Sequence, residues 1–272
     1  MHYINPVALQ LGPLQIRWYA IAIVTGIAIA VAMAVFEARR VGLEDDDIYD
    51  FVLWAVPLSF IGSRLYYVAF EWSYYKEHLD QIFAIWNGGI AIYGGLIAGG
   101  IFLYFFCKKR NLSLLQYLDI AAPAVIIAQG IGRWGNFFNH EAFGAIISKT
   151  QLESMHLPTW LINNMNINGH YRTPTFLYES MWDILGGLGI IIYRHFRKSL
   201  HKGELFALYL IWYAFGRFFI EGMRTDSLYI ANTSLRVSQC LSMVLFIVGV
   251  LLFIVVYRNK KNVYTRNHNG IK

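Results

Sequence analysis

The chain has 272 residues, of which 57% are hydrophobic and 15% are charged, and its formal net charge is +6. Soluble domains are typically about 45–50% apolar and about 25% charged, so this composition excludes an ordinary soluble domain and indicates a polytopic membrane protein. In such a protein an excess of Lys and Arg belongs first to cytoplasmic loops, and we therefore expect no nucleic-acid partner.

The N-terminus carries no basic region ahead of its first apolar run and no clear cleavage site. We therefore interpret that run as a retained first span rather than as a signal peptide. The two cysteines, Cys107 and Cys240, fall on opposite sides of the bilayer in the topology predicted below. We expect no disulfide, no metal site and no cofactor.

Seven apolar runs are long enough to cross a bilayer as helices, which takes roughly 17–25 residues. The predicted spans are residues 17–37, 50–70, 88–107, 119–138, 175–194, 205–222 and 237–257. The sequence therefore predicts an all-α integral membrane protein with seven transmembrane helices, organised as a single membrane domain over residues 1–272.

Basic residues gather after alternate spans, on one side of the predicted bundle. They are Arg39, Arg40, Lys108, Lys109, Arg110, Arg194, Arg197, Lys198, Lys202, Arg258, Lys260, Lys261, Arg266 and Lys272. This set holds more than half of the 23 Lys and Arg of the chain. By the positive-inside rule that side is cytoplasmic, so we expect the N-terminus outside and the C-terminus in the cytoplasm.

Three segments then lie outside the membrane. Residues 2–16 form a short arm with two prolines, and residues 71–87 form a loop rich in aromatic side chains. Residues 139–174 form the longest connection, and a connection of that length is usually functional or carries structure of its own. We expect a small extracytoplasmic head in this third segment.

Three arginines lie inside predicted spans at a shared depth. Arg64, Arg133 and Arg217 each lie five or six residues from the outer end of a different span. At about 1.5 Å per residue, all three sit roughly 8–9 Å inside the outer boundary, and Tyr93 and Glu179 fall at the same depth. An ionised side chain in a bilayer costs about 2.5–3.5 kcal/mol on insertion scales, so each such group is a functional candidate by default.

These features also have purely structural explanations. Arg217 and Glu221 could form an ordinary i, i+4 ion pair, and Arg64 could be a structural pair or a snorkelling side chain. Gly95 and Gly99 could serve helix packing alone, as a GxxxG pair. None of these explains why three arginines share one depth in three helices. Gathered cations need an anion, and Arg binds phosphate bidentately, so we expect a phospholipid head group at that depth.

The stretch from Gly132 to Glu141 reads Gly-Arg-Trp-Gly-Asn-Phe-Phe-Asn-His-Glu, and it closely resembles the signature of bacterial prolipoprotein diacylglyceryl transferases. Further blocks that resemble family motifs are Arg17-Trp18-Tyr19, Asn87 to Gly95, Pro174 to Glu179 and Tyr213 to Arg224. Together these blocks extend the resemblance over nearly the whole chain. It implies seven spanning helices with an extracytoplasmic head, in agreement with the topology predicted above.

The resemblance also implies an activity. Members of the family transfer the diacylglyceryl group of phosphatidylglycerol to the lipobox cysteine thiol of a lipoprotein precursor, and glycerol phosphate leaves. The implied partners are phosphatidylglycerol, the prolipoprotein signal peptide with its lipobox cysteine, and the lipid bilayer. The implied location is the bacterial cytoplasmic membrane, as a multi-pass protein.

The same resemblance maps functional positions onto this chain, to which we add candidates from the depth argument and the glycine-rich motif. The candidate catalytic residues are Arg133, Glu141, Arg217, Glu221 and Tyr93. The candidate substrate-binding residues are Arg133, Asn136, Tyr19, Tyr213, Arg64, Gly94 and Gly95. The chain departs from the family pattern at Tyr93, where the glycine-rich motif often carries a histidine that has been proposed as a base.

The expected chemistry is a displacement at the lipid glycerol carbon that bears the phosphate. Because the nucleophile is the cysteine of the peptide, the enzyme needs no nucleophile of its own. Arg133 and Arg217 would hold the phosphate, stabilise the leaving group and favour the thiolate, since cations lower a thiol pKa that is ordinarily near about 8.5. Either Glu141 or Glu221 could accept the thiol proton or orient an arginine.

Two other classes of protein are the alternatives. A transporter or channel for an organic anion should carry polar residues through the inner halves of several spans, but the inner halves of spans one, three, six and seven are almost wholly apolar. A lipid-binding structural protein would fit the arginine cluster without any chemistry. An assay for modification of a lipobox peptide separates both alternatives from an enzyme.

Overall fold

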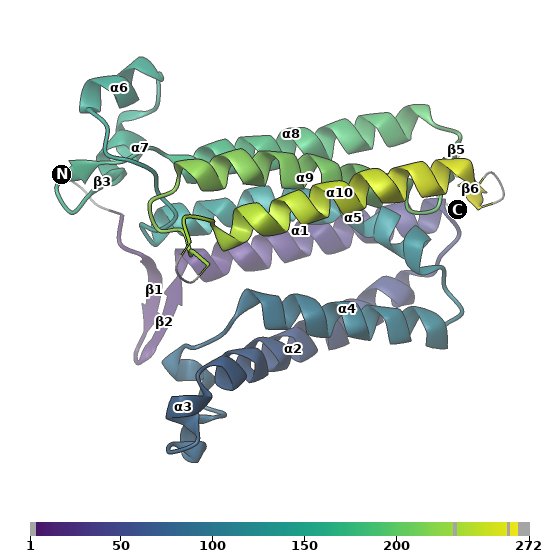
Figure 1. Cartoon of the computed structure of the whole chain (residues 1–272), viewed down its shortest axis with the longest axis horizontal. Helices are drawn as coiled ribbons and strands as arrows, with labels where there is room; N and C mark the ends of the chain where they lie inside the picture. The colour runs from purple at the N-terminus through teal and green to yellow at the C-terminus, as the bar shows by residue number, and fades with distance from the viewer. Residues whose placement is uncertain (1–3, 231–232, 260–261, 266–272) are drawn as a thin grey trace. The chain divides into compact units, whose positions relative to one another are not determined.

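The structure, a computed structural model, describes residues 4–230, 233–259 and 262–265 (Figure 1). Its long helices are α1 Trp18–Arg40, α2 Asp45–Phe70, α4 Ile92–Lys109, α5 Leu114–Phe138, α8 Thr175–Phe196, α9 Glu204–Met223 and α10 Val237–Arg258. Within the described residues, these seven helices are long and apolar enough to cross a membrane. The prediction of seven spanning helices is confirmed, and each helix overlaps its predicted span nearly end to end.

Shorter elements fill the connections between the spans. The helical ones are α3 Trp72–Tyr75, η1 Leu79–Gln81, η2 Ile85–Asn87, α6 Lys149–Ser154 and α7 Thr159–Asn164. In the described part of the chain, the strands pair as three antiparallel ribbons. They are β1 Val7–Leu11 with β2 Leu14–Arg17, β3 Asn166–Ile167 with β4 His170–Tyr171, and β5 Ser199–His201 with β6 Val263–Thr265. The sequence analysis predicted none of these ribbons, although the spanning part is helical as expected.

Contacts within the chain divide it into two compact units. The first holds the described residues of Met1–Ala34 and Leu118–His268, and the second holds those of Val35–Tyr117. That residues 1–272 act as a single membrane domain stays a prediction.

In the first unit, α9 packs against both α8 and α10 (Figure 1). A reciprocal pair of tryptophans fixes α8 against α9. The Nε1–H of Trp182 donates to the carbonyl of Trp212 (3.0 Å), and the Nε1–H of Trp212 donates to the carbonyl of Trp182 (2.9 Å). The two rings stack with their centroids 4.3 Å apart, and each lies over a glycine of the facing helix, Gly186 or Gly216. A side chain at either glycine would overlap the indole, so this pair sets the register of the two helices.

The beginning of α9 is held by a carboxylate from α5. Asp119 is fully buried, and it accepts hydrogen bonds from the backbone N–H groups of Gly203 (2.7 Å) and Phe206 (2.9 Å). The first N–H groups of a helix have no partner within the helix, and the helix dipole favours a negative charge beside them. Asp119 therefore fixes where α9 begins, and with it the position of every later α9 side chain.

Residues 139–174 fold as a small head with an apolar cluster of its own. The buried members of this cluster are Phe137, Leu152, Leu161, Ile162, Met165 and Phe176. A capping box begins α6, in which the Ser148 hydroxyl accepts from the Gln151 amide and the Gln151 side chain accepts from the Ser148 amide. Since Phe137 belongs to α5 and Phe176 to α8, the cluster anchors the head on the ends of those two helices.

In the second unit, α2 and α4 pack closely because small residues line their contact. A Cβ atom on Gly94 would overlap the carbonyl oxygen of Gly62, and one on Gly95 would lie 2.6 Å from Oγ of Ser63. A Cβ atom on Gly100, by contrast, would meet nothing within 4 Å. Gly94 and Gly95 thus serve the close approach of two helix backbones that small-residue motifs permit.

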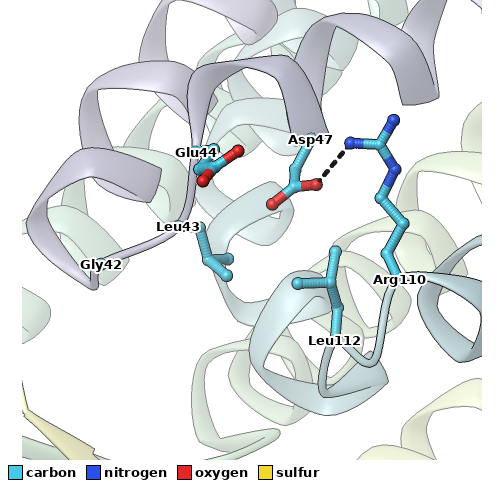
Figure 2. Close-up of a pocket in the computed structure, with 6 residues that line it drawn as sticks. All are labelled: Gly42, Leu43, Glu44, Asp47, Arg110 and Leu112. Carbon is cyan, nitrogen blue, oxygen red and sulfur yellow. Dashed lines mark hydrogen bonds and ion pairs between the residues drawn. The ribbon is translucent and has the colours of Figure 1, made fainter.

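A cavity of about 380 Å³ lies at the end of the second unit where α2 begins, and its lining residues are Gly42, Leu43, Glu44, Asp47, Arg110 and Leu112 (Figure 2). Arg110 donates to Asp47 (2.9 Å) and to Asp50, so its charge is already balanced by two carboxylates. The cavity contains none of the predicted site residues. Arg64, the nearest of them along α2, lies 17 residues further on, roughly 25 Å at the rise of a helix.

Candidate active site

Four charged side chains from three helices of the first unit form one buried network. Glu179 of α8 lies at its centre, where its Oε1 forms an ion pair with Nη2 of Arg133 (2.9 Å) and accepts a hydrogen bond from Nη1 of Arg217 (2.9 Å). Nη1 of Arg217 also donates to Oε2 of Glu179 (3.1 Å), and its Nη2 donates to Oε2 of Glu221 (2.5 Å). The side chains of Glu179 and Glu221 are 3% and 2% exposed. Two arginines therefore share one buried carboxylate.

The helices place these groups together for identifiable reasons. Arg133 lies near the end of α5, Glu179 lies in the second turn of α8, and Arg217 lies in the second half of α9. Trp182 follows Glu179 closely along α8. The register that the tryptophan pair sets between α8 and α9 therefore brings Glu179 opposite Arg217. Buried charges persist only when they are paired and hydrogen-bonded, and this network pairs two cations with two anions.

The two arginines differ in the donor capacity that remains to them. Arg217 is engaged through both Nη atoms, and its side chain is 12% exposed. Arg133 gives one Nη to Glu179, and its buried Nε has no hydrogen-bond partner among the described residues. A buried N–H left unpaired is costly, about 1–3 kcal/mol, and of the two arginines it is Arg133 that keeps such a donor.

The end of α5 presents Glu141 beside this network. The amide of Glu141 donates to the carbonyl of Asn136 (3.0 Å), and the amide of His140 donates to that of Phe137 (3.1 Å). With His140 in the left-handed conformation at φ 53°, these two bonds form the Schellman motif that ends many helices. The side-chain amide of Asn136 also donates to Oε1 of Glu141 (3.0 Å). Asn136, predicted to bind substrate, is thus engaged in holding an exposed carboxylate.

Two tyrosines border the charged groups. Tyr19, in the first turn of α1, covers Gly135, where a Cβ atom would lie 2.7 Å from the ring. Tyr19 interacts electrostatically with Glu141 and Arg133, and Tyr213 interacts in the same way with Arg133 and Arg217. Seven predicted site residues lie together in the first unit. They are Tyr19, Arg133, Asn136, Glu141, Tyr213, Arg217 and Glu221.

Arg64 belongs to the second unit and has a different set of partners. Its Nε donates to the carbonyl of Ile82 (2.8 Å) and its Nη2 to that of Gln81 (2.7 Å). Its Nη1 donates to the carbonyls of Gly88 (2.6 Å) and Gly89 (2.7 Å). All three nitrogens of this buried guanidinium are therefore engaged in fixing the loop that precedes α4. The substrate-binding role predicted for Arg64 stays a prediction, and its geometry matches the structural alternative.

The remaining predicted residues also lie in the second unit. Tyr93 is half-buried in the first turn of α4, directly before Gly94 and Gly95. The two glycines pack against α2 as described above, which matches the helix-packing alternative for this motif. Their predicted roles toward substrate stay predictions.

Sequence reasoning left out residues that the structure places in the site. Glu179 was noted only for its depth, yet it joins both arginines. Asp183, one turn after Glu179, is 1% exposed, and its Oδ2 has no partner among the described residues. The i, i+4 spacing of Glu179 and Asp183 on one apolar helix was the signal available in the sequence.

A cavity of about 430 Å³ lies in the head next to the end of α5. It is lined by His140 and by the turn between β3 and β4, residues Asn166, Ile167, Asn168 and Gly169. His140 directly precedes Glu141 in the chain. The cavity is large enough for several side chains of an extended peptide.

The fold and the site together define a polytopic membrane enzyme, with a buried arginine–glutamate network beside an accessible carboxylate. Residues 6–255 match the family model of prolipoprotein diacylglyceryl transferase, and the chain belongs to this family. The chain is therefore a transferase, and the resemblance found in the sequence is confirmed.

Curated relatives support the same assignment along the whole chain. The phosphatidylglycerol–prolipoprotein diacylglyceryl transferase of Limosilactobacillus reuteri (strain DSM 20016) is 51% identical over 268 residues, which cover 98% of this chain and 96% of the relative. The enzyme of the same name from Streptococcus sanguinis (strain SK36) is 56% identical over 261 residues, covering 95% and 97%. That from Enterococcus faecalis (strain ATCC 700802 / V583) is 54% identical over 256 residues, covering 94% and 92%.

Proposed function

We propose that the chain transfers the diacylglyceryl group of phosphatidylglycerol to the lipobox cysteine of prolipoproteins, the first step of lipoprotein maturation. The family and the printed names of the relatives support both substrates. The observation that carries the proposal in this structure is Arg133, a membrane-embedded arginine with a buried donor left unpaired. A phosphate oxygen would satisfy that donor, because arginine pairs with phosphate through charge-assisted hydrogen bonds.

In the reaction, the thiolate of the peptide attacks the lipid glycerol carbon that carries the phosphate. A sulfur–carbon bond forms as the carbon–oxygen bond breaks, and the electron pair leaves with glycerol phosphate. Arg133 stabilises the charge that develops on the departing phosphate oxygen, and the thiol proton passes to a carboxylate. Every group required comes from the two substrates and this site.

The difference in exposure between Glu141 and Glu221 supports a different role for each of these two glutamates. Glu221 is 2% exposed and paired with Arg217, so it serves to orient that arginine. Glu141 is exposed and held by Asn136, so it is accessible to an incoming thiol. We assign proton acceptance to Glu141. Arg217, held by two carboxylates, acts by fixing Glu179 against Arg133.

The test is the initial rate of peptide modification with purified protein, phosphatidylglycerol and a lipobox peptide, read from the peptide mass. Glu141→Gln is expected to lose most of the rate at every pH between about 6 and 9, because the amide accepts no proton at any of these values. Tyr93→Phe is expected to lose about 0.5–1.5 kcal/mol of transition-state stabilisation, the net value of one neutral hydrogen bond. If Tyr93→Phe is inactive while Glu141→Gln keeps its rate, the proton acceptor is Tyr93.

We further propose that the protein lies in the bacterial cytoplasmic membrane with its head outside and its C-terminus in the cytoplasm. The bacterial origin of the relatives supports the choice of membrane. The asymmetry of Lys and Arg supports the orientation. Cysteines introduced at Ser148 and Asn166 are expected to react with an impermeant thiol reagent in intact cells. A cysteine at Ser199 is expected to react only after permeabilisation, and labelling of Ser199→Cys in intact cells would reverse the assignment.

A further inference from the structure

The residue that follows Glu141 has an unusual backbone. Ala142 is in the left-handed conformation at φ 57°, although it is not a glycine, and its side chain is 3% exposed. Side chains other than glycine avoid this region because Cβ approaches the backbone too closely. Two left-handed residues, His140 and Ala142, therefore flank Glu141. Such a conformation persists only where surrounding contacts enforce it.

The enforcing contacts on Ala142 come from two different elements. The amide of Ala142 donates to Oδ2 of Asp226 (3.1 Å), and its carbonyl accepts from the hydroxyl of Thr175 (2.5 Å). Thr175 begins α8, and Asp226 follows the end of α9. Both polar groups of the Ala142 backbone are thus held, one by α8, which carries Glu179, and one by the segment that follows α9, which carries Arg217.

Asp226 is itself held rigidly. The Nε and Nη2 of Arg224 donate to Oδ1 and Oδ2 of Asp226, each over 2.9 Å. The intervening Thr225 donates to the carbonyl of Phe143 from its amide (3.2 Å) and from its hydroxyl (3.3 Å), and Gly144 forms a β-bridge with Arg224. Residues 142–144 are therefore bound along residues 224–226. This pairing requires Gly144, whose Cβ atom would meet the carbonyl of Met223 at 2.9 Å.

Asp226 keeps its charge under the conditions in which the enzyme works. Burial alone would raise the pKa of Asp226, but the hydrogen bonds and charge of Arg224, together with the Ala142 amide, hold it below its usual range. A lowered pKa in the folded state means that the contacts of this carboxylate stabilise the fold above the ordinary aspartate pKa, and are lost only as the pH falls through the lowered value. Across about pH 6–9 the carboxylate is an acceptor.

We propose that Asp226 is a positioning residue for Glu141, acting through the amide of Ala142. The proposal rests on the proposed role of Glu141 as the proton acceptor. Without the Asp226 carboxylate, the backbone at Ala142 relaxes toward negative φ, and the carboxylate of Glu141 turns away from the thiol. Asp226 lies beyond the end of α9. Within the part of the chain that the structure describes, its side chain is hydrogen-bonded to Ala142 and Arg224, and not to the four charged side chains of the buried network.

The experiment measures kcat, the KM for phosphatidylglycerol and the melting temperature of the purified full chain, with a lipobox peptide as acceptor. Asp226→Ala is expected to lower kcat about ten- to hundredfold, the usual value of one hydrogen bond to a charged group, with the lipid KM unchanged. Asp226→Asn keeps an acceptor oxygen for the Ala142 amide and is expected to recover most of kcat. The matched control is Glu153→Ala, which removes a carboxylate from an exposed ion pair in α6 and is expected to leave kcat unchanged.

A double-mutant cycle separates positioning from a merely structural role. If Asp226 acts through Glu141, adding Asp226→Ala to Glu141→Gln lowers kcat no further. Additive losses, or a lowered melting temperature with wild-type kcat in Asp226→Ala, overturn the inference. An inactive Glu141→Gln beside a fully active Asp226→Ala overturns the inference alone. A fully active Glu141→Gln overturns the proposed role of Glu141 and this inference with it.

Discussion

Glu179→Gln is expected to abolish transfer. The amide keeps the shape of the carboxylate but removes one of the two negative charges that balance Arg133 and Arg217. Removing one partner of a buried ion pair costs about 3–5 kcal/mol, because the remaining charge stays buried without compensation. Because Arg133 is then no longer held in place by the carboxylate, and one lost donor to the developing charge costs about 10²–10³ in kcat, the rate should fall by more than about a hundredfold. The measurement is the initial rate of peptide modification together with the melting temperature in detergent.

Glu153→Gln is the matched control for that change. Glu153 lies in the head and pairs with Lys149 at 3.3 Å, with both side chains about half exposed. Exposed pairs of this kind contribute about 0–1 kcal/mol, so neither the rate nor the melting temperature should change measurably. A Glu179→Gln protein with wild-type rate and stability would show that the shared carboxylate is not needed to balance the two arginines.

Arg133→Lys is expected to lose transfer while the protein remains folded. Lysine keeps the positive charge and can still pair with Glu179, but it lacks the planar fork whose Nε remains available for an anion. We expect the loss mainly as a slower kcat, about a hundredfold or more, because the lost hydrogen bonds act on the charge of the leaving phosphate. The melting temperature should change little. Single-turnover rates at saturating lipid measure this effect directly.

Two comparisons make the arginine experiment decisive. Arg39→Lys, in an exposed ion pair with Asp45 at the end of α1, is the matched control and should behave as the wild type. Arg217→Lys removes the guanidinium that donates hydrogen bonds to two buried carboxylates, so it should lower the melting temperature as well as the rate. Equal, near-normal turnover in Arg133→Lys and Arg217→Lys would remove phosphate binding as the reason for the cluster.

The spanning helices could be predicted from the sequence because hydropathy and helix length are local quantities. The connections could not, since α6 and α7 are two short helices whose apolar faces are explained only by a cluster that includes Phe137 and Phe176. The ribbon of β5 with β6 joins residues more than 60 positions apart in the chain. No local pattern indicates such a pairing.

The site was predictable in its members but less so in their partners. Depth along a helix correctly placed Arg133, Arg217 and Glu179 at one level, and the structure joins them through Glu179. Depth said nothing about direction around the helix, and the guanidinium of Arg64 turns to the backbone carbonyls of a loop. Asp226 carried no sequence signal at all, because its partner is a backbone amide 84 residues away.

The reciprocal hydrogen bonds of Trp182 and Trp212 limit how a lipid can reach this site. Separating α8 from α9 would leave two indole N–H groups without acceptors in hydrocarbon, where each unsatisfied polar group costs several kcal/mol. These two helices are therefore expected to stay in contact while substrates enter and products leave. Phosphatidylglycerol must therefore arrive, and glycerol phosphate must depart, along paths that do not separate α8 from α9.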